Sequence, residues 1–430
     1  MYSFISKYRG LFLLIPVFFI LGNIFAPLSY VLLFFVMSFW LIKGKHETAV
    51  IALVLILAMG DSRMPSMEFD KTLRIIAILL IGIQTIVDLF RKKYRFRGVM
   101  LASIPFFIVA TIGGLRSPET GTSLSKMVSY FLILLVAFHY LPYHIQRTKG
   151  ALYLDILKLA AWILVVGLVF IVLNNNVAYL LYRYRGLMGN PNGLGIYSTM
   201  IFMMMMVGRS LFPHEQKFIR FLTALIIFSV LLSESRTSLG TIGIFMVLYF
   251  FYKSGKGRKW SLWLFFLPLG FLLFNLLDYE ALLKSMGLGE YLRVESLSTG
   301  TGRYLAWEIG WRHMQENLWI GRGFAYEEIF FKAQKGFLIS TEHQGGIHNS
   351  YLTFIMNNGI IGFLCIAFFY TRIFTKIKIE KFKMPVIITV LISANFESWL
   401  TSSLNAFTVH YLIILAVLMN YSLIQKSIRK

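Results

Sequence analysis

The sequence predicts an all-α integral membrane protein, a polytopic bundle of about 12–14 transmembrane helices with a long extracytoplasmic loop that contains an amphipathic helix. Hydrophobic residues make up 57% of its 430 residues and charged residues only 14%, a balance far outside that of soluble proteins. Apolar runs long enough to cross a bilayer recur from end to end, and they are continuous, unlike the alternating strands of a transmembrane β-barrel. One mostly polar stretch, between Asp278 and Asn349, interrupts them.

The apolar runs set the order of the predicted spans and divide the chain into three regions. We expect transmembrane helices joined by short loops over residues 1–277, an extracytoplasmic loop over 278–348, and the C-terminal helices over 349–430. Apolar spans offer few groups for chemistry, so the functional residues are expected in the loop and in the other outward connections. The predicted spans are residues 10–26, 28–42, 48–60, 73–90, 99–114, 125–141, 153–173, 192–210, 218–233, 237–252, 260–277, 349–371, 384–399 and 404–424.

The distribution of charge orients these helices. The net charge is +22. If the N-terminus is inside, every second connection is rich in Lys and Arg, and the opposite side holds most of the 20 carboxylates. The basic excess therefore contacts lipid headgroups and does not indicate binding to nucleic acid. Both termini are predicted to be cytoplasmic, and residues 278–348 are predicted to lie outside.

No metal site and no cofactor are expected. The chain has one cysteine, Cys365, within an apolar run, so neither a disulfide nor a cysteine-based metal site can form within it. Asp278 and Glu280 are carboxylates that could bind a metal, but they lie at a helix exit without a nearby histidine.

The outward connection over residues 182–193 contains arginines, glycines and an Asn-Pro-Asn step. This composition favours a tight turn that leads into a helix, with Asn192 near its start. One interpretation is an interfacial belt of Tyr and Arg followed by a helix cap. The other is that Arg183 and Arg185 form the wall of a glycan or phosphate site.

A second outward connection, residues 232–240, is very short, so Arg236 must lie at or slightly below the outer headgroup level. A guanidinium at that depth usually has an anionic partner. Glu234 could be that partner. The alternative is a substrate phosphate, held by Arg236 together with Ser and Thr hydroxyls and the free N–H groups of the next helix.

Within the long loop, residues 299–308 indicate a capped helix start. Arg303 lies at its N-terminal end, where backbone N–H groups favour an anion, although a plain surface arginine fits as well. Arg312 lies off the apolar stripe. An amphipathic helix at the membrane interface fits the spacing of the apolar residues Tyr304, Trp307, Trp311, Met314 and Leu318.

The loop ends in two histidines, His343 and His348. Asn349 is a good N-cap for the apolar helix that follows, which puts His348 beside the positive end of a helix dipole. That location disfavours imidazolium and keeps the ring neutral near pH 7, as a general base requires. A lone interfacial histidine commonly has no such role. Further into this helix, in the sequence Asn357-Asn358-Gly359, the side-chain amides of the two asparagines need hydrogen-bond partners within the membrane.

Three segments, in the same order, resemble the bacterial O-antigen ligase/polymerase superfamily. Residues 233–239 (Ser-Glu-Ser-Arg-Thr-Ser-Leu) resemble its arginine-bearing stretch. Residues 302–323 resemble its Gly-Arg…Trp…Pro…Gly-x-Gly block, with Leu318 in place of the usual proline. Residues 348–362 resemble its His-Asn-x-(Tyr/Phe)-Leu…Gly-x-x-Gly block, and residues 190–193 (Asn-Pro-Asn-Gly) are similar to an upstream element.

The resemblance implies a metal-independent, inverting glycosyltransferase of the bacterial inner membrane that uses no nucleotide. Its donor would be a glycan on undecaprenyl pyrophosphate, and its site would face the periplasm. Arg236 and Arg303 would neutralise the pyrophosphate leaving group, and His348 would be the general base for the acceptor hydroxyl. The residues expected to bind substrate are Arg183, Arg185, Asn190, Asn192, Trp307, Arg312, His343, Asn349 and Tyr351.

The acceptor distinguishes branches that share these motifs. It is lipid A–core in ligases, a second lipid-linked repeat in polymerases, and a protein Ser or Thr in protein O-oligosaccharyltransferases. The loop length and the spacing of the arginines and histidine resemble those of ligases, so a ligase is predicted, with the other two as alternatives. A transporter of lipid-linked sugars is a different class, and it would place ionisable residues within the spans.

Overall fold

The computed structural model describes residues 2–61, 67–94, 96–255, 303–334, 346–402 and 404–429. These residues are helical apart from turns, loops and one hairpin of two-residue strands. Among them, 7 helices are long and apolar enough to cross a membrane, or 8 if the bent pair α23 (Ala406–Met419) and α24 (Tyr421–Arg429) is one span. The predicted all-α membrane class is therefore confirmed.

Each predicted span that falls within the described residues coincides with helical structure, whereas the span predicted over residues 260–277 lies outside them. The first half of the chain contains α1 (Tyr2–Lys7), α2 (Arg9–Ile24), α3 (Ala26–Ile42), α4 (His46–Met59), α5 (Asp70–Phe90), α6 (Ile104–Leu115), α7 (Thr120–Leu135), α8 (Leu141–Arg147), α9 (Ala151–Leu173) and α10 (Asn175–Ala178). The second half contains β1 (Tyr179–Leu180), β2 (Arg183–Tyr184), α11 (Pro191–Leu211), α12 (Gln216–Ser233), α13 (Arg236–Lys253), α18 (Arg303–Met314), α19 (Tyr326–Ala333), α21 (Ser350–Lys376) and α22 (Glu380–Phe396) before α23 and α24.

The last predicted span differs from the expectation because it is bent. The axes of α23 and α24 meet at 74°. At the bend the Asn420 side chain donates to the carbonyl of Ala416 (2.6 Å), which competes with a continuing helix. α24 then packs against α8 through its apolar side, with basic residues in its last turn. A separation of apolar and basic sides is typical of helices that lie along a membrane surface.

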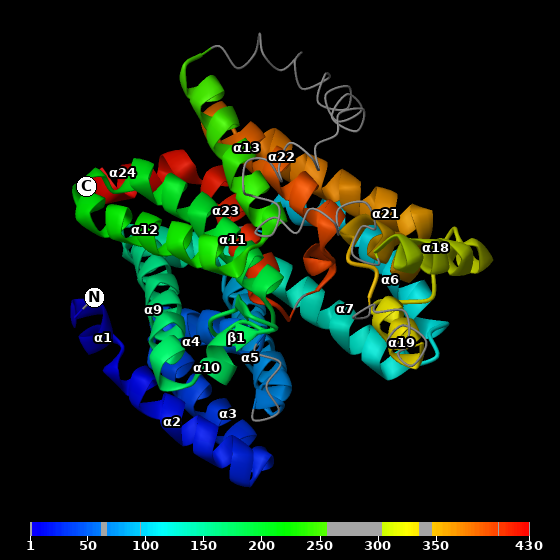
Figure 1. Cartoon of the computed structure of the whole chain (residues 1–430), viewed down its shortest axis with the longest axis horizontal. Helices are drawn as coiled ribbons and strands as arrows, with labels where there is room; N and C mark the ends of the chain where they lie inside the picture. Colours follow the sequence, from blue (N-terminus) through cyan, green and yellow to red (C-terminus); the bar gives the residue numbers. More distant parts are fainter. Residues whose placement is uncertain are drawn as a thin grey trace.

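Connections that were predicted to share a side of the membrane meet at the same end of the molecule. At one end the amino group of Lys7 lies 2.8 Å from Asp155, near the start of α9. At the other end Asp61 accepts a hydrogen bond from the backbone of Gly189 (3.1 Å), and Arg74 donates to the carbonyl of Leu404. In Figure 1 the two termini lie at the left and α18 and α19 at the right. These connections therefore lie at two opposite ends of the molecule, and which end faces the cytoplasm stays a prediction.

The core of the bundle is built around α11 and α23, which are buried on nearly all sides. α11 contacts α9, α12, α13 and α23. Its four consecutive methionines, residues 203–206, are all buried, so they pack against other helices and not against lipid. Both core helices begin at the same end, where Asn190 caps α11 and Asn405 caps α23. The best-packed helices of the molecule therefore fix the residues at that end.

α21 is interrupted at Gly359, whose backbone (φ 65°, ψ 179°) is available almost only to glycine. The segment before α19 fills the interruption. Ile360 donates its N–H to the carbonyl of Leu318 (2.8 Å), and Gly323 donates to the carbonyl of Asn357 (2.8 Å). A Cβ on Gly359 would lie 2.2 Å from the backbone of Trp319. The segment with the Gly-x-Gly sequence (residues 321–323) therefore packs directly against the interruption of α21 at Gly359.

The amides that were expected to need partners within α21 differ in what they contact. The side chain of Asn357 accepts from the backbone N–H of Glu327 (2.7 Å), which ties α19 to α21. The side chain of Asn358 is buried, and within the described structure neither its nitrogen nor its oxygen has a hydrogen-bond partner. The expectation is therefore met for Asn357 and not for Asn358.

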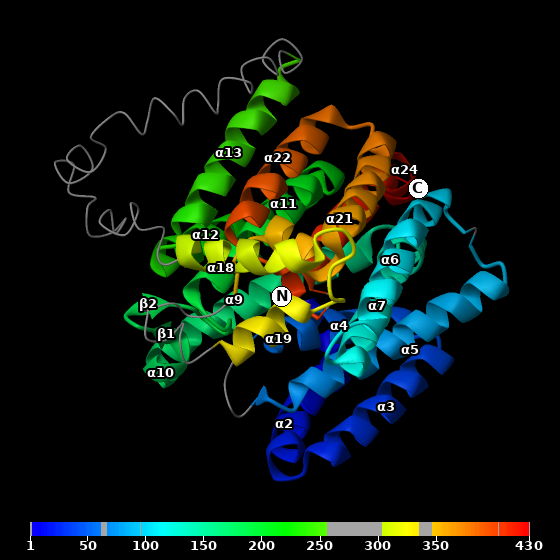
Figure 2. The ribbon, with the colours of Figure 1, turned by 90° about the vertical axis from the view of Figure 1, so that its right-hand side faces the viewer.

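α18 lies across α21 near the start of that helix, as Figure 2 shows. Its buried face is centred on Ala306, Gly310 and Met314, whereas Trp311, predicted to share the apolar stripe, is 48% exposed. Small residues set this face because they allow close approach: a Cβ on Gly310 would lie 2.8 Å from the side chain of Ile347. α18, α19 and the start of α21 thereby form a second, smaller hydrophobic core.

Candidate active site

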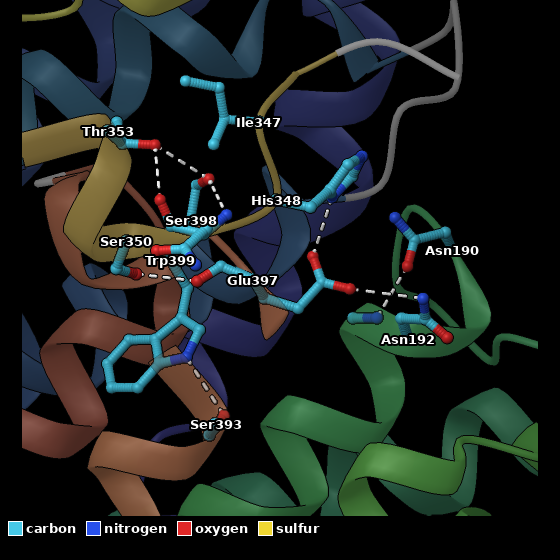
Figure 3. A network of polar contacts seen from close by, with 12 residues as sticks. Asn190, Asn192, Ile347, His348, Ser350, Thr353, Ser393, Glu397, Ser398 and Trp399 are labelled. Carbon is cyan, nitrogen blue, oxygen red and sulfur yellow. Dashed lines mark hydrogen bonds and ion pairs between the residues drawn. The ribbon is translucent and has the colours of Figure 1, made fainter. Parts of the chain in front are cut away.

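Three segments that are far apart in the sequence meet around the carboxylate of Glu397 (Figure 3). Nδ1 of His348, just before α21, lies 3.1 Å from one of its oxygens. The side-chain amide of Asn192, in the first turn of α11, donates to the other oxygen (3.2 Å). Glu397 itself follows the last residue of α22. One carboxylate therefore joins the predicted base to the start of a core helix.

The backbone around His348 explains how its ring reaches Glu397. Asn349 is the N-cap of α21, as predicted, and its side chain accepts from the N–H groups of Tyr351 (3.0 Å) and Leu352 (3.1 Å). The backbone N–H of Asn349 donates to Ser398 Oγ (3.0 Å). His348 has a left-handed backbone (φ 49°), which costs a residue other than glycine about 1–2 kcal/mol. The surrounding contacts maintain this conformation.

The turn that carries Glu397 is fixed to α21 through hydroxyl groups. Ser350 donates to the carbonyl of Glu397 (2.7 Å), and Thr353 lies 3.0 Å from Ser398 Oγ. The side chain of Glu397 is 14% exposed and that of His348 is 28% exposed. Both groups are therefore largely shielded from water, and an interaction between them is stronger than it would be on the surface.

Glu397 was not among the expected site residues, because it lies in the apolar run over residues 384–399, which the sequence predicts as one span. α22 ends at Phe396, so Glu397 stands outside the helix. A signal was available. An ionisable residue at the end of an apolar run is costly within a membrane and therefore indicates a functional site with a specific partner. That partner, His348, could not be identified without the fold.

Arg183 lies on the other side of Asn192 and joins two helix ends. Its guanidinium donates to the carbonyl of Ser233 through Nε (3.1 Å) and Nη2 (2.7 Å), and to the side-chain oxygen of Asn192 (3.2 Å). A carboxylate oxygen of Glu234 lies 4.0 Å away. Arg183 thus connects the end of α12 with the start of α11, and it carries positive charge next to the Asn192–Glu397–His348 contacts.

Two other predicted residues of this connection have contacts that stabilise the loop. Asn190 caps α11, with its side chain accepting from the N–H of Gly193 (2.6 Å). The guanidinium of Arg185 donates to the carbonyls of Val177 (3.0 Å) and Asn176 (3.1 Å) in the preceding segment. For these two residues the contacts favour the simpler interpretation, a helix cap and a folded turn. Their contact with substrate remains a prediction.

Arg236 is the first residue of α13, and the start of this helix packs closely against the start of α11. A Cβ on Gly195 would lie 2.3 Å from Ser238 Oγ and 2.6 Å from Ser235 Oγ, so only glycine permits this approach. Gly195 is one turn from Asn192 along α11. The structure therefore places the backbone of Arg236 at a helix start beside the same core helix that contacts Glu397.

The residues predicted on α18 separate into two groups. The indole N–H of Trp307 donates to the carbonyl of Ile347 (2.8 Å), so Trp307 touches the residue directly before His348. Arg312 pairs with Glu308 on its own helix, and its side chain is 76% exposed. The contacts of Trp307 join it to the site, whereas the described contact of Arg312 is a surface ion pair.

Three predicted residues remain. Arg303 is the first residue of α18, but its side chain lies outside the described part of the structure, as does all of His343. The hydroxyl of Tyr351 donates to the carbonyl of Leu391 (2.6 Å) and so ties α21 to α22.

In the ranges that the structure describes, no three His, Cys, Asp or Glu side chains are grouped so that they could hold a metal ion.

The arrangement of His348, Glu397 and Arg183 is suited to taking up a proton next to an anionic substrate. If Nδ1–H of His348 donates to Glu397, the ring is held in one tautomer and orientation, and the lone pair falls on Nε2. The carboxylate also stabilises the imidazolium that forms when Nε2 accepts a proton. Arg183 and the N-terminal ends of α11 and α21 contribute positive potential around this pair.

Comparison with known proteins identifies one family. The model of the family described as O-Antigen ligase matches residues 221–367, from α12 to α21. The matched segment contains Arg236, Arg303 and His348, whereas Glu397 and the connection before α11 lie outside it. No curated protein matches the chain.

Proposed function

We propose that this protein is an O-antigen ligase, because residues 221–367 match the model of the family described as O-Antigen ligase, a match that suggests a glycan-transferring membrane enzyme. It takes a glycan from undecaprenyl pyrophosphate and transfers it to a hydroxyl group of lipid A–core. The reaction takes place at the periplasmic face of the bacterial inner membrane, with both termini in the cytoplasm. The observation that carries the proposal is the contact between His348 and Glu397, 3.1 Å apart at the helix start that the family match includes.

In the proposed reaction the acceptor oxygen attacks the anomeric carbon of the donor glycan. The bond between that carbon and the phosphate oxygen breaks, and undecaprenyl pyrophosphate leaves with the bonding electrons. Nε2 of His348 takes the hydroxyl proton, and Glu397 stabilises the resulting imidazolium. Because the acceptor enters opposite the leaving group, the anomeric configuration inverts.

The leaving group needs positive charge because negative charge develops on its phosphate oxygen. We assign this role to Arg236 and Arg303, whose planar guanidinium groups bind two phosphate oxygens at once. The start of α13, where Arg236 lies, also offers backbone N–H groups to an anion. Arg183 supports this assembly by holding the end of α12, only three positions before Arg236, against α11. Such fixed positive groups stabilise the transition state without a metal ion.

The experiment that tests this function supplies the purified protein, in lipid nanodiscs, with an undecaprenyl-pyrophosphate-linked oligosaccharide. One sample receives lipid A–core and another receives no second acceptor. We expect the glycan on lipid A–core only in the first sample, with release of undecaprenyl pyrophosphate and the same rate in EDTA. Longer lipid-linked chains in both samples would instead identify a polymerase. Absence of transfer, with and without an added acceptor protein, would reject a glycosyltransferase.

A further inference from the structure

We propose that Glu327 is a positioning residue that holds His348 in its left-handed conformation through the backbone of Ile347. Glu327 is the second residue of α19 and does not itself contact the His348–Glu397 pair through any described hydrogen bond. The inference rests on the proposed function, because the position of His348 limits the rate only if His348 is the general base.

The peptide groups on both sides of Ile347 Cα are held by side chains from two different helices. The N–H of Ile347 donates to Oε1 of Glu327 (2.8 Å), and its carbonyl accepts from the indole of Trp307 (2.8 Å). The side chain of Ile347 is fully buried in the small core of α18, α19 and α21. Ile347 therefore has little freedom to rotate, and the direction in which His348 follows it is set.

Glu327 can act as a fixed support because its own backbone is attached to α21. Its N–H donates to the side chain of Asn357 (2.7 Å), two turns into that helix. The side chain then bridges from this attachment back to Ile347, just before the same helix begins. The contacts therefore form a closed ring. Asn357 of α21 holds Glu327, Glu327 holds Ile347, and Ile347 leads through His348 back to the start of α21. The attachment through Asn357 does not depend on the Glu327 carboxyl group, so the two can be tested separately.

The surroundings of Glu327 indicate that its side chain has a specific task. It is 6% exposed, and burial raises the pKa of its carboxyl group. A buried carboxyl is unfavourable unless it makes compensating hydrogen bonds. His348, two positions before the first residue of α21, has a left-handed backbone that persists only where neighbouring groups enforce it. The N–H of Ile347 is the group through which Glu327 provides that constraint on one side, while Ser398 and Glu397 provide it on the other.

The test compares Glu327→Leu with Glu327→Gln. Leucine removes the acceptor for the Ile347 N–H but keeps an apolar side chain of similar size, whereas glutamine keeps a carbonyl oxygen in the same place. The matched control is Glu328→Gln, because Glu328 is the adjacent carboxylate, is 59% exposed and pairs with Lys126. Glycan transfer from an undecaprenyl-pyrophosphate-linked oligosaccharide is measured as kcat and donor KM, together with the thermal unfolding midpoint.

We expect Glu327→Leu to lower kcat about 100-fold, because misplacing a reacting group by about 1 Å has an effect of this size. Its donor KM should stay unchanged, and Glu327→Gln and Glu328→Gln should retain most of kcat. Trp307→Phe, which removes the other hydrogen bond to Ile347, should lower kcat in the same way and serves as a second probe if Glu327→Leu does not fold. Wild-type kcat in both Glu327→Leu and Trp307→Phe would overturn the inference.

Two further outcomes would also overturn it. If Glu327→Gln is as slow as Glu327→Leu, the hydrogen bond to Ile347 is not what matters. If kcat, donor KM and the unfolding midpoint all deteriorate together in Glu327→Leu and Trp307→Phe, the role of Glu327 is only structural. His348→Ala, measured alongside, separates the two proposals. An active His348→Ala rejects the base and the inference with it, whereas an inactive His348→Ala with normal Glu327→Leu and Trp307→Phe rejects only the inference.

Discussion

The carboxylate of Glu397 lies 3.1 Å from Nδ1 of His348, although 49 positions separate the two residues in the sequence. The same carboxylate accepts from Asn192, which in turn accepts from Arg183. A continuous set of polar contacts therefore runs from the predicted base to a guanidinium next to the start of α13. Acidic, basic and neutral side chains are thus joined at the end of the bundle where α11, α13 and α21 begin.

His348→Ala should abolish most of the activity. Loss of a positioned general base typically lowers a rate by about 10²–10⁴-fold. The variant should still insert into the membrane and bind undecaprenyl pyrophosphate, because the arginines are unchanged. The measurement is kcat for glycan transfer together with donor binding. His343→Ala should be milder, and His214→Ala, an exposed residue between α11 and α12, should be indistinguishable from wild type. A nearly normal rate for His348→Ala would show that another group takes the proton.

Glu397→Gln should slow transfer by about 10²-fold or more, because the amide can donate to Nδ1 and thus favour the wrong tautomer of His348. Glu397→Ala should be slow as well, and less stable, since Asn192 then loses its acceptor. Donor KM should change little in either variant. The measurement is the dependence of the rate on pH. The limb of this profile that reports the protonation of His348 should shift in both Glu397 variants and should stay in place in Glu328→Gln. An unshifted profile would mean that Glu397 does not act on His348.

The local features of the site could be predicted from the sequence, because they depend on neighbouring residues. Asn349 precedes an apolar run, was predicted as an N-cap and caps α21 in the structure. Asn192, predicted near a helix start, lies in the first turn of α11, whose cap is Asn190. The same logic located the starts of α13 and α18 near Arg236 and Arg303. Helix periodicity and capping are properties of a few consecutive residues.

The pairing of these local features could not be predicted. Glu397 was assigned to a span, since one carboxylate beside apolar residues does not show where a helix ends. Its contact with His348 depends on how α21 and α22 pack against each other and on α11. Likewise, Arg185 and Arg183 lie two positions apart and look equivalent in sequence. The hairpin turns one toward the backbone of its own loop and the other toward Asn192.

Arg236→Ala and Arg303→Ala should each abolish transfer, and the two lysine variants should recover only part of it. A lysine keeps the positive charge but loses the planar pair of N–H groups that binds two phosphate oxygens. Donor affinity should fall in parallel, measured by competition with undecaprenyl pyrophosphate. Arg220→Ala, an exposed arginine in the opposite end of α12, serves as the control for loss of a charge. Full transfer by both lysine variants would argue against a pyrophosphate clamp.

Gly359→Ala should destabilise the protein more than any other Gly→Ala change in α21. The backbone of Gly359 (φ 65°, ψ 179°) lies in a region that costs other residues about 1–3 kcal/mol. In addition, a Cβ there would lie 2.2 Å from the backbone of Trp319, so the segment that joins α18 to α19 would have to move away. That movement would pull on Asn357, which holds both Gly323 and Glu327, and so reach Ile347 and His348. Activity should therefore fall together with stability.

The matched control is Gly240→Ala in α13, where an added Cβ would meet nothing within 4 Å. Alanine is the better helix former there, so this variant should unfold at the same temperature as wild type or slightly higher. The measurement is the thermal unfolding midpoint of both variants in the same detergent, with glycan transfer assayed in parallel. Equal midpoints for Gly359→Ala and wild type would show that the interruption of α21 is not held by the loop segment. In that case the contact between the loop segment and α21 would not be needed to hold Asn357, Glu327 and His348 in place.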